Sequence, residues 1–341
     1  MKVAITDGKG NLWIEEVPIP QINDYQCLCK ILACATCTGT DIKIIEGRMF
    51  WLKDYPVMLG HESVGKVIKK GKKVKYINEE DLFLRPCAVY PGEKSGDFYS
   101  AIGGFAEYGL ILDTKAFKED NPEKDINSYS IYQQKISLDI LPPEATMLIT
   151  LKETSSFLFN IGVKLNSSVA ILGSGPVGMA LCYFSKILGS NPVIAIGRNK
   201  NTLNYIKKLG ADYIIITEDE NIEKTIKEIT KDKGMDFIID TTGNKKFVLS
   251  LITSLSEKGK ICPYASYENE DVFKEYKEDK RFMLTNPEEP LANDYIHRMI
   301  NLNCLTPSVF YSKILPFSEI KHGFELLKRK EEFKIVFTME E

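Results

Sequence analysis

A glycine-rich hexapeptide, Gly173-Ser174-Gly175-Pro176-Val177-Gly178, has the G-x-G-x-x-G spacing of a phosphate-binding turn. It follows a short apolar run at 169–172 and precedes a helical pattern, the context that gives the spacing its meaning. The first glycine permits the tight turn, the second lets backbone approach a pyrophosphate, and the third lets the helix pack on the strand. Backbone N–H groups at the helix start would then bind the diphosphate. The hexapeptide predicts a dinucleotide site, with a glycine turn in an unliganded sheet as the alternative.

The end of the next predicted strand indicates which dinucleotide is bound. An NAD site normally carries an acid about 20 residues after the turn, where it binds the ribose 2′-OH. Here the strand at 193–196 ends in Gly197-Arg198-Asn199, and the next acid is Asp212. The small glycine leaves room for a 2′-phosphate, and Arg198 can pair with that phosphate. We therefore expect NADP(H) rather than NAD, the alternative being that Arg198 is an ordinary surface arginine.

A later strand end contributes to the same predicted site. Thr241 and Thr242 follow the strand at 236–240 on the cofactor side of the sheet. By topology alone, we expect them to contact the nicotinamide half of the cofactor.

A second set of reactive residues lies early in the chain, in Cys37-Thr38-Gly39-Thr40-Asp41 and in Gly60-His61-Glu62. Further landmarks follow in order: Gly103-Gly104-Phe105-Ala106-Glu107-Tyr108, the glycine-rich turn, Phe324-Glu325-Leu326-Leu327 and Lys334-Ile335-Val336. Over nearly its whole length, the chain resembles the zinc-dependent medium-chain alcohol and polyol dehydrogenases.

The resemblance implies a catalytic zinc between two domains. Cys37 and His61 would be its ligands, and Glu62 a direct or indirect one. A zinc held by thiolate, imidazole and carboxylate keeps an open position for a substrate oxygen, where it acts as a Lewis acid. Hydride would pass between the substrate carbon and the nicotinamide. Thr40 matches the hydroxyl that relays the alcohol proton outward in the family.

The chain departs from the family pattern around the predicted metal site. The Cys37-to-Asp41 spacing is one residue longer than the usual Cys-x-Thr/Ser-Asp, so Thr38 could take the ligand position instead of Cys37. Isoleucine and threonine occupy positions 149–150, where the family commonly draws another ligand. Glu153, about one helical turn on, could substitute as a metal ligand or be a plain helix carboxylate.

Two further departures concern the proton path and a second metal. Lys43 stands where many relatives have a relay histidine. Many relatives also carry four closely spaced cysteines that bind a structural zinc, but the matching stretch 85–104 contains only Cys87. We expect one catalytic zinc and no structural zinc.

The leading functional hypothesis is an NADP-dependent zinc oxidoreductase that interconverts a secondary alcohol, polyol or sugar alcohol with its ketone or aldehyde. The long Cys37-to-Asp41 spacing and the missing carboxylate near position 150 keep an alternative open. That alternative is a metal-free NADPH-dependent reductase of an activated double bond or carbonyl on the same fold. A dinucleotide-binding protein without turnover is disfavoured, because it has no need of Cys37, Thr40, His61 and Glu62 together.

The elements that must position these residues change character after residue 141. Short strands broken by turns precede this point, and strands alternating with helices follow a helix predicted at 144–161. We predict an α/β fold: a doubly wound parallel (Rossmann) sheet plus an N-terminal β-rich, barrel-like (GroES-like) catalytic domain. The predicted domains are 1–150, completed by 290–341, and 151–289.

Several local expectations accompany this fold. A helix is expected at 245–255, an irregular stretch at 267–290, and a helix capped by Ser318. Cys27 and Cys29, near Cys34 and Cys37, superficially suggest a four-cysteine zinc cluster. Because 26–33 reads as a strand, we interpret Cys27 and Cys29 as small apolar residues.

Composition excludes several other functions. The 341 residues carry a formal net charge of −3, which argues against a nucleic-acid binder. No apolar run approaches the ~18 residues of a membrane helix, and the first residues do not resemble a signal peptide. Eight cysteines in such a chain indicate thiols or metal ligands, and three histidines exclude a multi-histidine site. The absence of a membrane helix and of a signal peptide predicts a cytoplasmic protein. The family resemblance implies a homo-oligomer, a dimer or tetramer, with a small-molecule alcohol or carbonyl substrate.

Overall fold

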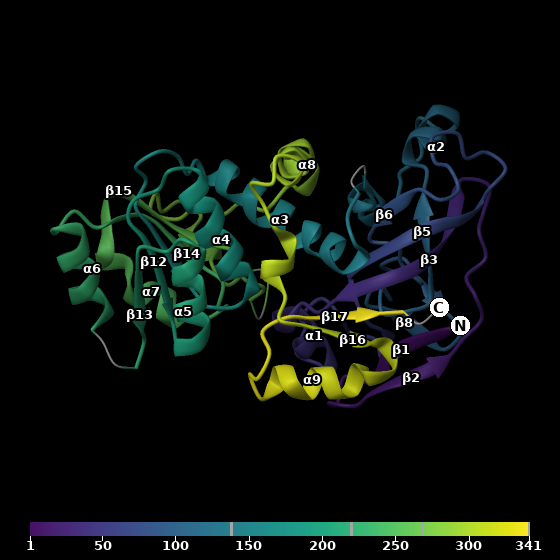
Figure 1. Ribbon diagram of the computed structural model, residues 1–341, viewed down its shortest axis with the longest axis horizontal. Helices are drawn as coiled ribbons and strands as arrows, with labels where there is room; N and C mark the ends of the chain where they lie inside the picture. Colours follow the sequence, from purple (N-terminus) through teal and green to yellow (C-terminus); the bar gives the residue numbers. More distant parts are fainter. Residues whose placement is uncertain (137–138, 219–220, 268, 270, 340–341) are drawn as a thin grey trace. The chain divides into compact units, whose positions relative to one another are not determined.

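The computed structural model divides into two compact units (Figure 1). Unit 1 comprises Met1–Ile149 and Asn293–Glu341, and unit 2 comprises Thr150–Ala292. The structure describes residues 1–136, 139–218, 221–267, 269 and 271–339. Helix α3 (Pro142–Ile161) contains the division between the units. Unit 1 is therefore built from two stretches of chain that are far apart in the sequence.

Unit 1 is rich in short strands. Its strands are β1 (Lys2–Thr6), β2 (Leu12–Glu16), β3 (Gln26–Ala35), β4 (Val57–Met58), β5 (Glu62–Lys70), β6 (Leu82–Leu84), β7 (Lys94–Ser95), β8 (Phe98–Ser100), β9 (Tyr108–Leu112), β10 (Lys135–Ile136), β16 (Lys313–Pro316) and β17 (Ile335–Thr338). Its helices are α1 (Thr38–Ile45), α2 (Thr114–Asp120), α8 (Asn293–Asn301) and α9 (Ile320–Lys328). The strands form one sheet in the order β2-β1-β4-β8-β7 and another in the order β10-β6-β5-β3-β17-β16, with β9 also paired to β3.

The C-terminal strand joins the two stretches of unit 1. Strand β17 lies between β3 and β16, antiparallel to β3 and parallel to β16. Phe337 on β17 lies opposite Cys34 and packs edge-on against Phe105, with ring centroids 5.7 Å apart. All three side chains belong to the same buried core cluster. Strand β17 is therefore part of the core of unit 1.

Unit 2 contains one five-stranded parallel sheet, in the order β13-β12-β11-β14-β15. Its elements after α3 are β11 (Val169–Leu172), α4 (Pro176–Ile187), β12 (Val193–Gly197), α5 (Lys200–Leu209), β13 (Tyr213–Ile216), α6 (Ile222–Thr230), β14 (Met235–Asp240), α7 (Lys245–Ser250) and β15 (Leu255–Pro263). The chain runs from β11 to β12 on one side and later returns to β14 on the other. The carboxyl end of β11 is thus a topological switch point, where ligands bind in open parallel sheets.

The fold corrects two local expectations. Helix α7 ends at Ser250, because β-branched Ile252 and Thr253 are weak helix formers and fall in or beside a 3₁₀ turn (Ile252–Ser254) before β15. The predicted helix at 245–255 is therefore wrong in its second half. Ser318 does not cap α9: it lies within a 3₁₀ turn (Phe317–Glu319) that leads into the helix.

The stretch at 267–290 was expected to be irregular or partly strand. Its described part contains a 3₁₀ turn at Lys274–Tyr276 and a single bridge between Ile261 and Phe282. Residues 268 and 270 of this stretch lie outside the described residues.

Candidate active site

The start of helix α1 fixes the position of Cys37. The carbonyl oxygen of Cys37 accepts bonds from the N–H groups of Thr40 (2.9 Å) and Asp41 (2.8 Å), and its own N–H donates to Oδ2 of Asp41 at 2.8 Å. The longer spacing between Cys37 and Asp41 is thus accommodated in a single helical turn. The hydroxyl of Thr40 lies 3.5 Å from Sγ of Cys37, whereas that of Thr38 donates to the Phe333 carbonyl.

His61 and Glu62 enter from a turn that requires glycine. Gly60 has φ +104°, and a Cβ there would lie 2.5 Å from the backbone nitrogen of Phe105. Glu62 then opens strand β5, where it pairs with Ala35 at the end of β3. Because Ala35 is two residues before Cys37, the pairing of β3 with β5 brings the two motifs together.

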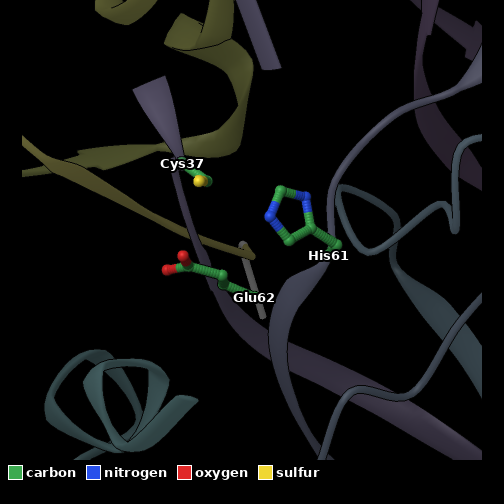
Figure 2. Close-up of side chains that lie close together, drawn as sticks. All are labelled: Cys37, His61 and Glu62. Atoms are coloured by element: carbon green, nitrogen blue, oxygen red, sulfur yellow. The ribbon is translucent and has the colours of Figure 1, made fainter. Parts of the chain in front are cut away.

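Cys37, His61 and Glu62 converge as the sequence predicts. Each offers one ligand atom, and these atoms all lie within 4.8 Å of one another. Figure 2 shows the sulfur of Cys37 and the carboxylate of Glu62 on the same side of the His61 ring. Thiolate, imidazole and carboxylate are the ligand types that bind zinc in proteins. The three residues therefore fit a zinc ion with three protein ligands and an open position.

The carboxylate of Asp41 faces Nδ1 of the His61 imidazole. Its Oδ1 lies 3.4 Å from Nδ1 of His61, and the Asp41 side chain is fully buried. Burial by itself would lower the pKa of His61, but Asp41 and Cys37 together raise it. The resulting pKa of His61 is well above the usual value for histidine. A carboxylate at Nδ1 leaves Nε2 as the nitrogen available to a metal, an arrangement common for metal-binding histidines.

Glu62 also forms a buried ion pair with Lys334, the residue before β17. The two side chains are only 3% and 2% exposed, respectively. Burial by itself would lower the pKa of Lys334, but the Glu62 carboxylate and the Cys37 sulfur raise it above the ordinary value. A permanent positive charge thus lies beside the candidate metal ligands and offsets part of their negative charge.

Asp41 and Lys334 are the site residues that sequence reasoning missed. Asp41 was visible as the acid that closes the Thr-Asp motif, although the sequence assigned it no role. Lys334 stands in the landmark Lys334-Ile335-Val336, but nothing in the sequence indicated that it pairs with Glu62, 272 positions away.

Glu153, the further predicted ligand, lies on α3 in unit 2. There its Oε2 is 3.5 Å from the hydroxyl of Tyr264. Its role as a metal ligand stays a prediction.

The glycine-rich turn follows β11 at the switch point. Gly173 has φ +114°, and a Cβ there would lie 2.1 Å from the hydroxyl oxygen of Thr241. A Cβ on Gly178 would lie 2.1 Å from the carbonyl oxygen of Gly173, whereas one on Gly175 would meet nothing within 4 Å. Two glycines are therefore required by packing, and Gly175 leaves open space in front of helix α4.

The ends of β12 and β14 lie beside this turn. Leu172 at the end of β11 is opposite both Ile196 and Asp240. Thr241 donates its N–H (2.9 Å) and its hydroxyl (2.8 Å) to the Leu172 carbonyl, and Thr242 donates both its N–H and its hydroxyl to the Asp240 carboxylate. The predicted residues Thr241 and Thr242 thus lie at the carboxyl edge of the sheet.

The second strand end is arranged around a buried glycine. Gly197 is buried at the end of β12, Arg198 is exposed, and Asn199 caps helix α5. The Asn199 side chain accepts the N–H groups of Asn201 (2.9 Å) and Thr202 (3.2 Å).

The stretch 85–104 is fastened by hydrogen bonds around Gln133. Its Nε2 donates to the carbonyls of Leu110 (2.9 Å) and Arg85 (3.1 Å), and its Oε1 accepts the Tyr90 hydroxyl (2.9 Å). Cys87, whose sulfur is 3.7 Å from the same Nε2, is fully buried, and burial raises the pKa of its thiol. Side-chain bonds therefore connect this stretch to β9.

Cys27 and Cys29 lie in strand β3, as interpreted from the sequence. Both are fully buried in an apolar cluster, and burial raises the pKa of Cys27 to about 12. The protonated thiol is consistent with a packing role.

Two family models match the chain. The model described as "Alcohol dehydrogenase GroES-like domain" matches residues 23–120, and the one described as "Zinc-binding dehydrogenase" matches residues 176–286. Together these ranges cover more than half of the sequence.

Known dehydrogenases are similar to this chain over most of its length. Sorbitol dehydrogenase of Bacillus subtilis (strain 168) is 28% identical over 275 residues, which cover 77% of this chain and 74% of that protein. The NADP-dependent isopropanol dehydrogenase of Thermoanaerobacter brockii is 28% identical over 259 residues, 73% and 71% of the two chains. The solved alcohol dehydrogenase TADH from Thermus sp. ATN1 superposes with a TM-score of 0.80 at 20% identity, covering 100% of both chains.

The chain belongs to the zinc-dependent medium-chain alcohol/polyol dehydrogenase family, whose members are oxidoreductases that use a nicotinamide cofactor. The predicted fold class, a GroES-like domain plus a Rossmann-type domain, is confirmed. Within the part of the chain that the structure describes, no helix combines the length and apolar character needed to cross a membrane.

Proposed function

We propose that this protein is a zinc-dependent oxidoreductase that transfers a hydride between NADP(H) and a secondary alcohol, polyol or sugar alcohol, or the matching ketone or aldehyde. The observation that carries the proposal is the convergence of Cys37, His61 and Glu62, with ligand atoms within 4.8 Å of one another. The similarity to two relatives, a sorbitol dehydrogenase and an isopropanol dehydrogenase, supports the substrate class.

Different residues of the chain would bind the metal, orient a ligand and transfer the proton. A bound zinc supplies Lewis acidity, which polarises a carbonyl or lowers the pKa of an alcohol. Cys37, His61 and Glu62 would hold the ion, and Asp41 would keep the His61 ring in its binding orientation. The Thr40 hydroxyl, 3.5 Å from the Cys37 sulfur, would accept the alcohol proton at Oγ1 and pass it outward.

The proposed binding site for the cofactor lies in unit 2, at the carboxyl ends of β11, β12 and β14. The turn at 173–178 would bind the pyrophosphate, and Thr241 and Thr242 would contact the nicotinamide half. Gly197 and the exposed Arg198 support a preference for NADP(H), since the first places no carboxylate at the strand end and the second supplies positive charge for a 2′-phosphate. The similarity to the NADP-dependent isopropanol dehydrogenase of Thermoanaerobacter brockii supports the same choice.

Metal content tests the zinc site directly. We expect about one zinc per chain in the purified, exhaustively dialysed protein and loss of that zinc in Cys37→Ala. Cys304→Ala is the matched control, because Cys304 is an exposed cysteine outside the site. If the wild type binds no zinc but still binds NADPH, the protein is instead a metal-free reductase, and enones and activated carbonyls become the substrates to screen.

Cofactor titration tests the NADP preference. We expect NADPH to bind at least about tenfold more tightly than NADH, and Arg198→Ala to narrow the difference. Arg281→Ala, which removes an exposed arginine elsewhere in unit 2, should leave both affinities unchanged. Equal affinities, or an NADH preference that Arg198→Ala does not alter, would contradict the assignment.

A further inference from the structure

Two hydroxyl groups meet beside the end of strand β12. Ser174 is the second residue of the glycine-rich turn, and Thr202 lies in the first turn of helix α5. The Thr202 hydroxyl donates to Oγ of Ser174 across 2.9 Å. Both residues are half-buried, so a ligand at the strand end can reach them.

The Ser174 side chain occupies the space in which an NAD-type acid would begin. A Cβ added to Gly197 would lie 2.9 Å from Oγ and 3.0 Å from Cβ of Ser174. Contacts this short require one of the two side chains to shift. In this chain Ser174 therefore fills the position from which an acidic side chain at residue 197 would hydrogen-bond a free ribose 2′-OH.

The available donors at this position are hydroxyl groups and a guanidinium. The side chain of Asn199 already accepts the N–H groups of Asn201 and Thr202, so the first N–H groups of α5 are engaged. The Thr202 proton is shared between Ser174 Oγ at 2.9 Å and the Asn199 carbonyl at 3.0 Å. Ser174 accepts from Thr202, and its own O–H proton is not used in that bond. The exposed Arg198 adds charged donors.

From this arrangement we infer that Ser174 is a specificity-determining residue that donates its hydroxyl proton to a phosphate monoester on the 2′-position of the cofactor's adenosine, and that Thr202 is a positioning residue that holds the Ser174 hydroxyl in place. The inference rests on the proposed NADP preference and names the residues that produce it together with Arg198. A phosphate dianion only accepts hydrogen bonds, so it matches a group of hydroxyl and guanidinium donors without a carboxylate. A free 2′-OH lacks this charge and would gain little from the same group of donors.

Binding of two nucleotide probes tests the inference without turnover or metal. Calorimetry would compare 2′,5′-ADP, which carries the 2′-phosphate, with 5′-AMP, which has a free 2′-OH. We expect Ser174→Ala to weaken 2′,5′-ADP binding about tenfold, because a hydrogen bond to a charged group is lost. Thr202→Val should also weaken 2′,5′-ADP binding, because the bond that holds the Ser174 hydroxyl in place is lost. Binding of 5′-AMP should remain within about twofold of the wild-type value.

Thr225→Val is the matched control. Its hydroxyl also bonds the carbonyl of a helix-capping asparagine, Asn221, at 3.0 Å, but on helix α6. This variant should bind both probes like the wild type. Three results overturn the inference: unchanged 2′,5′-ADP affinity in both Ser174→Ala and Thr202→Val, equal losses for the two probes, or the same loss in Thr225→Val.

The wild-type comparison separates this inference from the proposed function. If the wild type binds the two probes equally well, the NADP preference itself is wrong and the inference falls with it. If the wild type prefers 2′,5′-ADP and only Arg198→Ala reduces that preference, the NADP assignment stands and the roles of Ser174 and Thr202 are wrong.

A gain-of-binding experiment tests the steric part of the inference. Gly197→Asp alone should not improve 5′-AMP binding, since its Cβ meets Ser174. Gly197→Asp combined with Ser174→Gly should bind 5′-AMP about tenfold more tightly than Gly197→Asp alone. An equal gain in the single and double variants would show that Ser174 does not set the preference.

Discussion

At the scale of single residues, the most consequential contact is the buried pair of Lys334 and Glu62. Both side chains are almost fully buried. Removing one partner leaves a buried charge, which costs about 3–5 kcal/mol. We predict that Lys334→Met lowers the unfolding free energy of the metal-stripped protein by this amount, measured by urea denaturation.

A second lysine in unit 1 provides the control. Lys313 pairs with Glu332 at 3.3 Å, but its side chain is 39% exposed. Lys313→Met should therefore change stability by less than about 1 kcal/mol. Combining Lys334→Met with Glu62→Gln should restore part of the loss, because no buried charge is left unpaired. Similar small losses in the two single variants would mean that the buried pair contributes little to folding.

The residue scale also shows how far the sequence could predict the site. Cys37, His61 and Glu62 stand in short recognisable motifs, and the pairing of β3 with β5 brings them together. Lys334 could not be predicted, since neither its type nor its neighbours specify a partner 272 positions away. Lys334 comes close to Glu62 only because β17 pairs with β3, which in turn pairs with β5.

At the scale of elements, the glycines of the β11–α4 turn differ in how much space a side chain would have. A Cβ on Gly178 would lie 2.1 Å from the Gly173 carbonyl oxygen, whereas one on Gly175 has open space. We predict that Gly178→Ala destabilises the protein by about 1–3 kcal/mol, because backbone must move. Gly175→Ala should leave the melting temperature nearly unchanged and weaken NADPH binding, since it obstructs approach of the pyrophosphate.

Thermal denaturation and NADPH titration of the two variants would check this contrast. Loss of stability in Gly175→Ala would contradict the open space in front of α4. Wild-type stability in Gly178→Ala would contradict the close approach of helix and strand.

Patterns within elements were readable from the sequence, but the pairing of elements was not. Buried apolar runs alternating with amphipathic helices predicted the parallel sheet of unit 2. The run at 26–33 was read as a strand, yet nothing in it specifies β17 as a neighbour of β3. The predicted helix ends were also wrong where a 3₁₀ turn adjoins the helix, as after α7 and before α9.

At the scale of the whole molecule, each unit has its own core, and unit 1 depends on the end of the chain. Phe337 is fully buried against Phe105 and Phe324 in the core of unit 1. Phe184 is equally buried in helix α4 of unit 2. We predict that Phe337→Ala and Phe184→Ala each cost about 3–5 kcal/mol, but in different units.

Hydrogen exchange followed by mass spectrometry separates the two effects, because each unit opens according to its own core. Phe337→Ala should accelerate exchange in peptides from 1–136 and 293–339 and lower zinc retention, while peptides from unit 2 stay protected and 2′,5′-ADP still binds. Phe184→Ala should give the opposite pattern, with rapid exchange in unit 2 and zinc retained. If either substitution accelerates exchange equally in both units, the chain unfolds as one cooperative body, and strand β17 stabilises unit 2 as well as unit 1.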